Sequence, residues 1–240
     1  CVYEAKDVYD RLLNYTNRVL FFPMDDFITS EVTDISPEFV IDRLTTLNKL
    51  LGSGKYIVVT NLMGILRYLP NTKLYKNKII DINKDMDIDR DDFINKLFDL
   101  GYEKKPVVSR TGEMAIRGYV IDIFPIEFDN PIRIEFWGDT IDSIKYFDLD
   151  DQISSTSVDS VKIYPYTEFL IDGKIEDNII RKQKYLLNYS DSVSGLWDYV
   201  SDSVIFYYDY NQIINSYSLL RDNILEYDSE LDDDIKTNYM

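Results

Sequence analysis

The stretches MAIRGYVIDIFP at residues 114–125 and PIRIEFWG at residues 131–138 decide the fold of this chain. Both are rich in β-branched and aromatic residues, a composition that favours strands. Short polar connections beside them have the composition of hairpin turns. The pattern predicts an antiparallel sheet that also includes PVVS (106–109) and TIDSIKYF (140–147), with turns at FDNP (128–131) and WGDT (137–140).

Outside this sheet the chain alternates helices and strands. Residues 36–52, SPEFVIDRLTTLNKLLG, begin with an N-capping serine and a proline, carry one apolar face and end at a glycine, which predicts a helix. The apolar run YIVVT at residues 56–60 is typical of a strand covered on both faces in a parallel sheet. Further along, the composition predicts a strand over residues 203–210 and a helix over residues 211–225.

These patterns predict an α/β fold interrupted by an insertion. Alternating helices and buried strands argue for an α/β layer, which we expect over residues 1–80 and 164–240. Between them, residues 81–163 are expected to form a small antiparallel β-rich domain, which also holds a helix capped by Asp89 and closed by Gly101.

The composition limits the chemistry available to the chain. Its 240 residues contain no histidine and one cysteine. This excludes a Ser-His-Asp triad, zinc sites built on imidazole or clustered cysteines, and an internal disulfide. The scarcity of cysteine favours the cytoplasm. The net charge of −17 weighs against unaided binding of nucleic acid, because nucleic-acid binders normally present a basic face.

The ends and the hydropathy of the chain add two expectations. No apolar run approaches the roughly 20 residues of a membrane span, so we expect no membrane partner. The start, CVYEAKDVYDRLL, lacks the pattern of a signal peptide. Because the chain begins with Cys1, we expect it to be a piece of a longer protein.

Two segments resemble ligand-binding motifs but lack the deciding residues. GSGKY at residues 52–56 has no glycine at the start of the motif, and Tyr56 stands where a phosphate-binding loop needs serine or threonine. We interpret it as a C-capping turn. DMDIDRDDFINK at residues 85–96 has Arg90 and Lys96 where a calcium loop needs glycine and glutamate. We interpret it as an acidic turn before a helix N-terminus.

The strand at residues 131–138 has two chemically different faces. By strand alternation these carry Ile132, Ile134 and Phe136 on one side, and Arg133, Glu135 and Trp137 on the other. Arg117, on a neighbouring strand, can join the second face. An exposed tryptophan beside arginine is typical of a binding hot spot. Alternatively, Trp137 folds over its own sheet edge and Arg133 pairs with Glu135 as a surface ion pair. Alternation alone leaves both interpretations open.

The same residues resemble a known family. Residues 101–154, from GYEKKPVV to DDQIS, are similar to the signature segment of transcription-repair coupling factors (Mfd), which reads approximately RGGIIDIFP followed by RIEFFgDEIdSIR. Upstream, FPMDDFITSEVTDIS and the helix after it (residues 22–51) and YIVVTNLMGILRYLP (56–70) resemble the N-terminal region of that family. The resemblance extends from about residue 18 to about residue 170.

This resemblance implies a fold and a function. Residues 1–80 and 164–240 would form a degenerate helicase-like domain, similar to domain 1 of UvrB, that has lost its ATPase motifs. The insertion at residues 81–163 would dock UvrA, the damage-recognition ATPase. The chain would then be a non-catalytic module without a cofactor of its own. RNA polymerase, DNA and ATP would be bound by other parts of an ATP-dependent DNA-translocating parent.

The resemblance also assigns roles to residues. In the family, residues at the positions of Arg117, Arg133 and Trp137 contact UvrA, and Glu135 is expected to orient the arginines. A planar guanidinium suits bidentate pairing with a carboxylate across an interface. The resemblance therefore implies that the partner surface carries acidic residues.

Three departures from the family pattern stand in this segment. Tyr119 replaces a second glycine, Trp137 replaces a phenylalanine, and Ile153 replaces the arginine of a TQRS motif. The first can alter the local bulge, and the third puts a role for that loop in doubt. Two other functions stay open: a fragment of a UvrB-type helicase and ATPase, which would need to bind nucleotide, and a nucleic-acid-binding module, which the charge disfavours.

Overall fold

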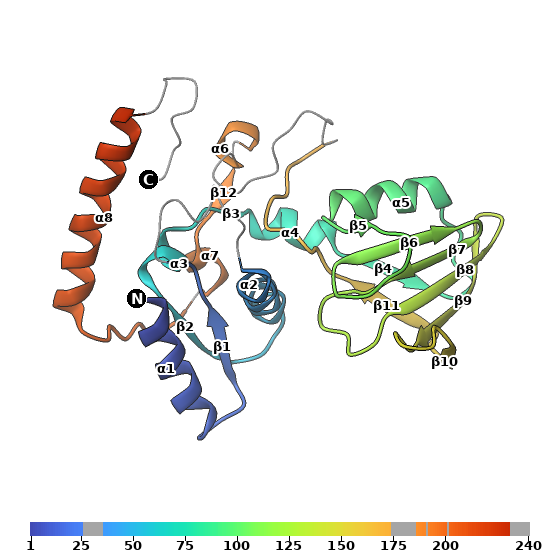
Figure 1. The fold of residues 1–240 in the computed structure, drawn as a ribbon, viewed down its shortest axis with the longest axis horizontal. Coiled ribbons are helices and arrows are strands. Elements are labelled where there is room, and N and C mark those ends of the chain that lie inside the picture. Colours follow the sequence, from blue (N-terminus) through green and yellow to red (C-terminus); the bar gives the residue numbers. More distant parts are fainter. Residues whose placement is uncertain (26–35, 174–185, 191, 201, 231–240) are drawn as a thin grey trace. The chain divides into compact units, whose positions relative to one another are not determined.

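The computed structural model describes residues 1–25, 36–173, 186–190, 192–200 and 202–230. The chain divides into two compact units, which are described separately (Figure 1). Unit 1 comprises residues 1–72 and 176–240, and unit 2 comprises residues 73–175. Unit 2 is wider at both ends than the insertion expected from the sequence, and the assignment of domains with separate functions stays a prediction.

Unit 1 contains helices and short strands, and the strands pair into two-stranded sheets. Strand β1 pairs in parallel with β2, and β3 pairs antiparallel with β12. The elements are α1 (Val2–Leu13), β1 (Val19–Phe22), α2 (Pro37–Leu50), β2 (Ile57–Thr60), α3 (Leu62–Leu66), β3 (Leu69–Pro70), α6 (Leu186–Tyr189), β12 (Val193–Ser194), α7 (Leu196–Tyr199) and α8 (Tyr210–Glu230), and α4 (Thr72–Lys78) begins at the boundary.

Helix α2 and the parallel strand pair follow the sequence pattern. Ser36 is the N-cap of α2, Pro37 is its first residue, and Leu44 and Leu47 on its apolar face are fully buried. The parallel pairing of the predicted strand β2 is confirmed by its register with β1. The expectation that β2 is covered on both faces is wrong, because Ile57 is 45% exposed. The pair has no third strand within the described residues.

The strand predicted over residues 203–210 is absent, although the helix predicted after it is present within α8. Residues 203–209 make no strand pairing, and Val204 and Phe206 are 80% and 90% exposed. β-Branched and aromatic residues favour a strand only where a neighbouring strand can pair with them and cover their side chains. The structure leaves this segment without such a neighbour in the described part of the chain.

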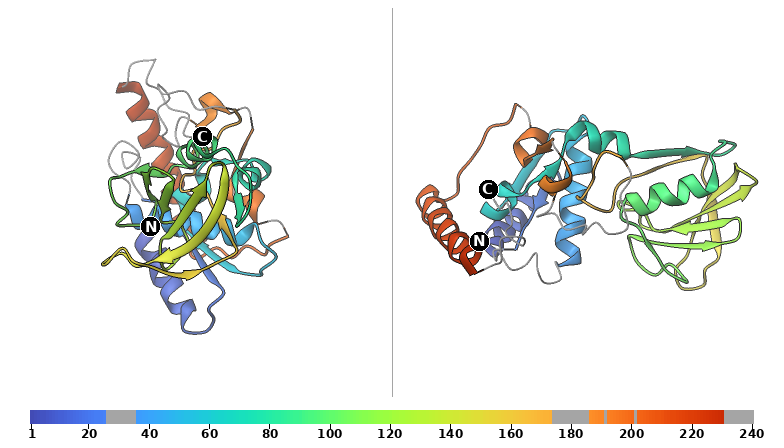
Figure 2. Two further views of the ribbon diagram at one scale, coloured as in Figure 1. Left: turned by 90° about the vertical axis from the view of Figure 1, so that its right-hand side faces the viewer. Right: turned by 90° about the horizontal axis from the view of Figure 1, so that it is seen from above.

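Unit 2 is built on a six-stranded sheet with the order β10-β9-β8-β7-β6-β5 (Figures 1 and 2). All neighbours are antiparallel except β5 and β6. The elements are β4 (Ile80–Asn83), α5 (Arg90–Asp99), β5 (Glu103–Lys104), β6 (Glu113–Arg117), β7 (Val120–Ile123), β8 (Ile132–Trp137), β9 (Thr140–Phe147), β10 (Ser154–Ser157) and β11 (Ser160–Ile163), with β4 and β11 forming an antiparallel pair.

Helix α5 covers one face of this sheet and supplies the core of unit 2. Phe93 and Leu97 on α5 pack in one buried cluster with the apolar side chains of β6 to β9, including Ile134 and Phe136. The predicted caps of the helix are confirmed: the Asp89 side chain accepts a hydrogen bond from the Asp92 amide at 2.8 Å, and Gly101 follows with a positive φ of 91°.

The central stretch at residues 114–125 is two strands rather than one. It reverses direction at Gly118, so that β6 and β7 form a hairpin with Arg117 opposite Val120. Gly118 has a φ of 59° and Tyr119 does not have a positive φ, as in a type II′ turn, which places glycine first. Because the second turn position does not require glycine, Tyr119 fits here without backbone strain. The strand predicted at PVVS is absent; β5 precedes that segment.

The two motif-like segments have the structural roles predicted for them. Residues 52–56 form a turn after α2, in which the Gly52 amide bonds to the Lys49 carbonyl. In the acidic turn, the Asp87 carboxylate accepts a hydrogen bond from Thr140 and Asp89 caps α5. Both segments are thus explained by local structure. Searching the described helices finds none with the length and hydropathy needed to span a bilayer.

Candidate functional site

The outer face of the unit 2 sheet, opposite α5, is the part of this domain with an unusual chemistry. The predicted division of β8 is confirmed, since Ile132, Ile134 and Phe136 are buried in the core. We define the outer face by the polar and aromatic side chains of β6 to β9 that alternate with the core residues: Arg117, Asp122, Arg133, Glu135, Trp137 and Lys145.

A buried carboxylate organises the arginines of the outer face. Asp122 on β7 is 0% exposed and lies directly opposite Arg133 on β8. One Asp122 oxygen accepts from Arg133 Nε at 2.7 Å, and the other accepts from Arg133 Nη2 at 3.0 Å. The second oxygen also accepts a hydrogen bond from Arg117 Nη2. A buried charge is tolerated when it is paired and hydrogen-bonded. Asp122 and both guanidinium groups therefore form one hydrogen-bonded network.

Arg133 is held on every side of its guanidinium group. Its Nη1 donates to the Gln152 carbonyl at 3.2 Å and to the Ser154 hydroxyl at 3.3 Å. Its guanidinium carbon lies 4.7 Å from the centre of the Phe147 ring, a favourable cation–π distance. The hydrogen bonds to Asp122 raise the pKa of Arg133, so this side chain is positively charged at any physiological pH.

Arg117 is more open to solvent than Arg133. Its side chain is 46% exposed, compared with 17% for Arg133. Among the described residues, Arg117 makes its side-chain hydrogen bond to Asp122 through Nη2 alone. A guanidinium has five N–H donors in a fixed plane. The Nε and Nη1 donors of Arg117 are therefore oriented by Asp122 but not used within the described part of the domain.

Glu135 pairs with the neighbouring strand rather than with the arginines. Its carboxylate accepts hydrogen bonds from Lys145 Nζ at 2.7 Å and from the Ser143 hydroxyl. These bonds hold the pKa of Glu135 below its usual value. The expectation that Glu135 orients the arginines is wrong: Asp122 does so. The alternative in which Arg133 pairs directly with Glu135 is also wrong.

Glu135→Gln is expected to make the stability of the chain less dependent on pH in acid. The lowered pKa means that ionised Glu135 stabilises the folded chain above its unfolded pKa, near 4.5, and that this contribution is lost as the pH falls through the folded pKa. Urea unfolding at about pH 6 and about pH 3.5 measures the effect. The control is Asp142→Asn, which removes an exposed carboxylate from β9. An equal loss of stability in wild type and Glu135→Gln would contradict this role.

Trp137 extends from the end of β8 into solvent. Its side chain is 83% exposed, so it does not fold over the sheet edge. It lies opposite Thr140, where β8 turns into β9. The turn between β6 and β7 is at the same end of the sheet, because β6 and β8 run in the same direction. An exposed aromatic side chain on the same sheet face as a partly exposed arginine is an arrangement typical of a binding surface.

Asp122 is the site residue that the sequence interpretation missed. Its signal was an acidic residue in the middle of the apolar strand VIDIF, at an alternate position to the core residues Ile121 and Ile123. Placing it opposite Arg133 required the exact register of β7 and β8. The loop residue Ile153, which replaces an arginine in the family pattern, is 64% exposed beside the Gln152 carbonyl that accepts from Arg133.

The outer face offers charged hydrogen-bonding groups and one exposed aromatic side chain. Across the residues that the structure describes, no cluster of three or more histidine, cysteine, aspartate or glutamate side chains is arranged to hold a metal ion. The groups that the outer face offers are fixed guanidinium donors, an ion pair and an exposed indole. These groups suit binding of an acidic protein surface.

Unit 2 and the chain as a whole are similar to known proteins. Residues 80–169 match the UvrB interaction domain family. The chain is 37% identical over 172 residues to the transcription-repair-coupling factor of Bacillus subtilis, covering 71% of this chain and 15% of that protein. It is 30% identical over 191 residues to the protein of that name from Staphylococcus epidermidis, and 32% identical over 185 residues to that of Staphylococcus aureus strain USA300; these alignments cover 79% and 76% of this chain.

The chain spans 15–16% of the length of these curated relatives. The family match covers the whole six-stranded sheet together with α5 and the β4–β11 pair. All four outer-face residues proposed from the sequence, Arg117, Arg133, Glu135 and Trp137, lie inside it. The chain is therefore similar to the N-terminal part of transcription-repair coupling factors, and its residues 80–169 match the UvrB interaction domain family.

Proposed function

We propose that this chain is a non-catalytic module that docks UvrA through the outer face of its UvrB interaction domain. The observation that carries the proposal is the Asp122 network, which fixes two arginines on the sheet face that also carries an exposed tryptophan, in an otherwise acidic chain. Fixed donors lose little conformational freedom on binding, which favours affinity. The position of this face inside the matched family domain supports the same function.

The two arginines have different proposed roles. Arg117 is the contact residue, since its unused guanidinium donors and its exposure allow a bidentate bond to a partner carboxylate. Arg133 is mainly a positioning residue, because Asp122, Gln152 and Ser154 already bind its donors. Trp137 supplies apolar contact area at the same end of the face. Glu135 fixes Lys145 beside these residues.

We assign further roles to unit 1 and to the other parts of the parent protein. Unit 1, a mixed α/β unit without a phosphate-binding loop at residues 52–56, would be a degenerate helicase-like domain related to domain 1 of UvrB. Other parts of an ATP-dependent translocating parent would bind RNA polymerase and DNA, in the cytoplasm. Docking of UvrA would then bring nucleotide excision repair to a stalled polymerase.

Amide hydrogen exchange with and without UvrA from the same organism tests which surface of the chain UvrA covers. Slower exchange is expected in the β6–β7 turn and the end of β8, residues 117–120 and 135–140, which lie at the exposed end of the outer face. Protection confined to unit 1 would contradict the proposed surface. Binding of ATP to the isolated chain would instead favour the alternative, a fragment of a UvrB-type helicase.

A further inference from the structure

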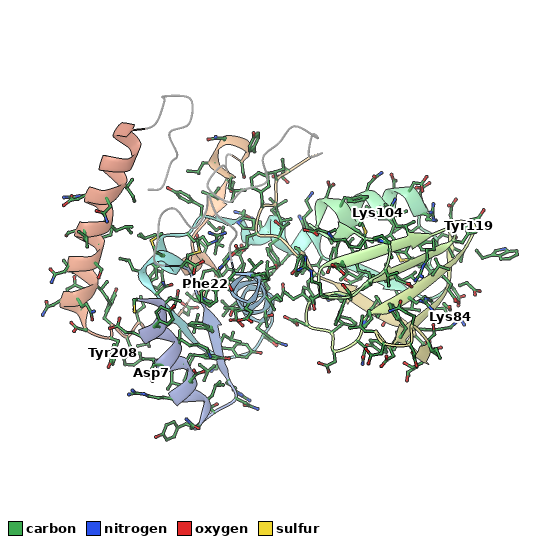
Figure 3. All side chains as sticks on the ribbon, viewed as in Figure 1. Asp7, Phe22, Lys84, Lys104, Tyr119 and Tyr208 are labelled. Carbon is green, nitrogen blue, oxygen red and sulfur yellow. The ribbon has the colours of Figure 1, made fainter. Side chains whose placement is uncertain are left out.

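Tyr119 is an exposed aromatic residue at the tip of the β6–β7 hairpin. Its side chain is 66% exposed, and it makes no hydrogen bond or ring contact with the residues that the structure describes. Figure 3 places it at the end of the sheet where β6 and β7 turn. Large aromatic side chains left exposed in this way are found where a protein meets a partner.

The backbone around Tyr119 is held by strand pairing and a hydrogen bond, although its side chain is exposed. The hairpin closes with a register of Arg117 opposite Val120, and Gly118 takes the positive φ of the turn. The Tyr119 carbonyl accepts a hydrogen bond from the Phe136 amide at 2.8 Å, which ties the turn to β8. A tyrosine held this way presents a large contact area at a low cost in conformational entropy.

The backbone positions of three recognition residues, Arg117, Tyr119 and Trp137, therefore lie at one end of the sheet. Tyr119 lies two residues from Arg117, and its backbone is bonded to the residue before Trp137. Two exposed aromatic side chains thus accompany the arginine that has unused donors. The complementary partner surface is a carboxylate next to an apolar side chain: the carboxylate binds Arg117, and the apolar group packs against the aromatic rings.

We infer that Tyr119 is a specificity-determining contact residue of the docking surface and selects a UvrA segment with an apolar side chain beside its carboxylate. This inference rests on the proposed docking of UvrA. The family pattern has glycine at this position. With glycine there, Arg117 would be the only side chain of this turn available to contact UvrA. Tyrosine adds a ring, so the cognate UvrA is bound more tightly than the charge pair alone allows.

Calorimetric titration of UvrA from the same organism into the chain tests this inference with three variants. Tyr119→Ala is expected to weaken binding about tenfold, the effect of losing a buried aromatic contact. Tyr119→Phe keeps the ring and is expected to stay within about twofold of wild type. Tyr15→Ala removes another exposed tyrosine, 87% exposed, from unit 1 and should leave the affinity unchanged. Unchanged unfolding midpoints show that each variant is folded.

The outcomes separate this inference from the function on which it rests. If Arg117→Ala abolishes binding while Tyr119→Ala binds like wild type, Tyr119 has no role in the surface, and docking of UvrA stands. If Tyr119→Phe weakens binding as much as Tyr119→Ala, the hydroxyl is the contact and the apolar partner chemistry is wrong. If folded wild type does not bind UvrA, the inference and the proposed docking fail together.

Discussion

Replacing Asp122 with asparagine is expected to destabilise unit 2 by about 3 kcal/mol, because it removes one partner from a buried ion pair. Asp122 is fully buried and accepts three hydrogen bonds from the two arginines. Asparagine has nearly the same shape but no charge, and its amide group brings donors toward guanidinium donors. Arg133, 17% exposed, is then left without a counter-ion in a poorly solvated position.

Amide hydrogen exchange under native conditions measures this change inside unit 2 without interference from unit 1. The amides of the buried residues Ile121 and Ile134, which lie opposite each other next to the Asp122–Arg133 pair, report the opening of the sheet. The matched control, Asp142→Asn, removes an exposed aspartate from neighbouring β9 and should leave both amides unchanged. Equal protection in wild type and Asp122→Asn would show that the network does not stabilise the sheet.

Asp122→Asn also tests the link between stability and recognition. If Asp122 positions Arg117, a variant that remains folded at low temperature should still bind UvrA less tightly than wild type. The reason is that Arg117 must then lose conformational freedom on binding that the hydrogen bond to Asp122 restricts in the wild-type chain. Asp142→Asn serves as the control for this measurement too.

Much of this architecture could be predicted from local patterns. Alternation along β8 placed Ile132 and Ile134 in the core and Arg133 outside, because side chains of a strand point to opposite faces in turn. The caps predict both α2 and α5, and an apolar face also predicts α2. These features depend on residues close together in the sequence.

The features that were missed depend on partners distant in the sequence. Asp122 pairs with Arg133, eleven residues away, and Arg133 also donates to the Gln152 carbonyl further along the chain. The reversal at Gly118 splits one apolar run into two strands. Residues 203–209 have the composition of a strand but pair with no strand in the described part of the chain. Composition does not reveal which distant segments pair with each other. Strand boundaries and the geometry of the site are therefore predicted less well than helices.

Arg117→Ala is expected to weaken binding of UvrA by about 2–4 kcal/mol, or roughly 30- to 1000-fold. The guanidinium is held by Asp122 through Nη2, its other donors make no hydrogen bond to the described residues, and the side chain is 46% exposed. Its loss would leave a partner carboxylate desolvated without a donor, which costs more than the bond itself contributes. Arg117→Lys should recover little, since an ammonium cannot form a bidentate pair.

A comparison of the two arginines separates contact from positioning. Arg117 is 46% exposed and bonds to one residue, so Arg117→Ala should change the free energy of unfolding far less than Arg133→Ala. Arg133→Ala removes a cation–π contact with Phe147 and four hydrogen bonds. Its effect on UvrA binding should therefore accompany a loss of stability, whereas that of Arg117→Ala should not.

Calorimetric titration of UvrA from the same organism into wild type and Arg117→Ala tests the central claim most directly. Arg18→Ala, which removes an exposed arginine from unit 1, controls for the change in net charge. The account predicts binding by wild type and Arg18→Ala, and binding weakened at least about 30-fold by Arg117→Ala with its unfolding midpoint unchanged. Wild-type affinity in folded Arg117→Ala would contradict the claim that UvrA docks on the outer face.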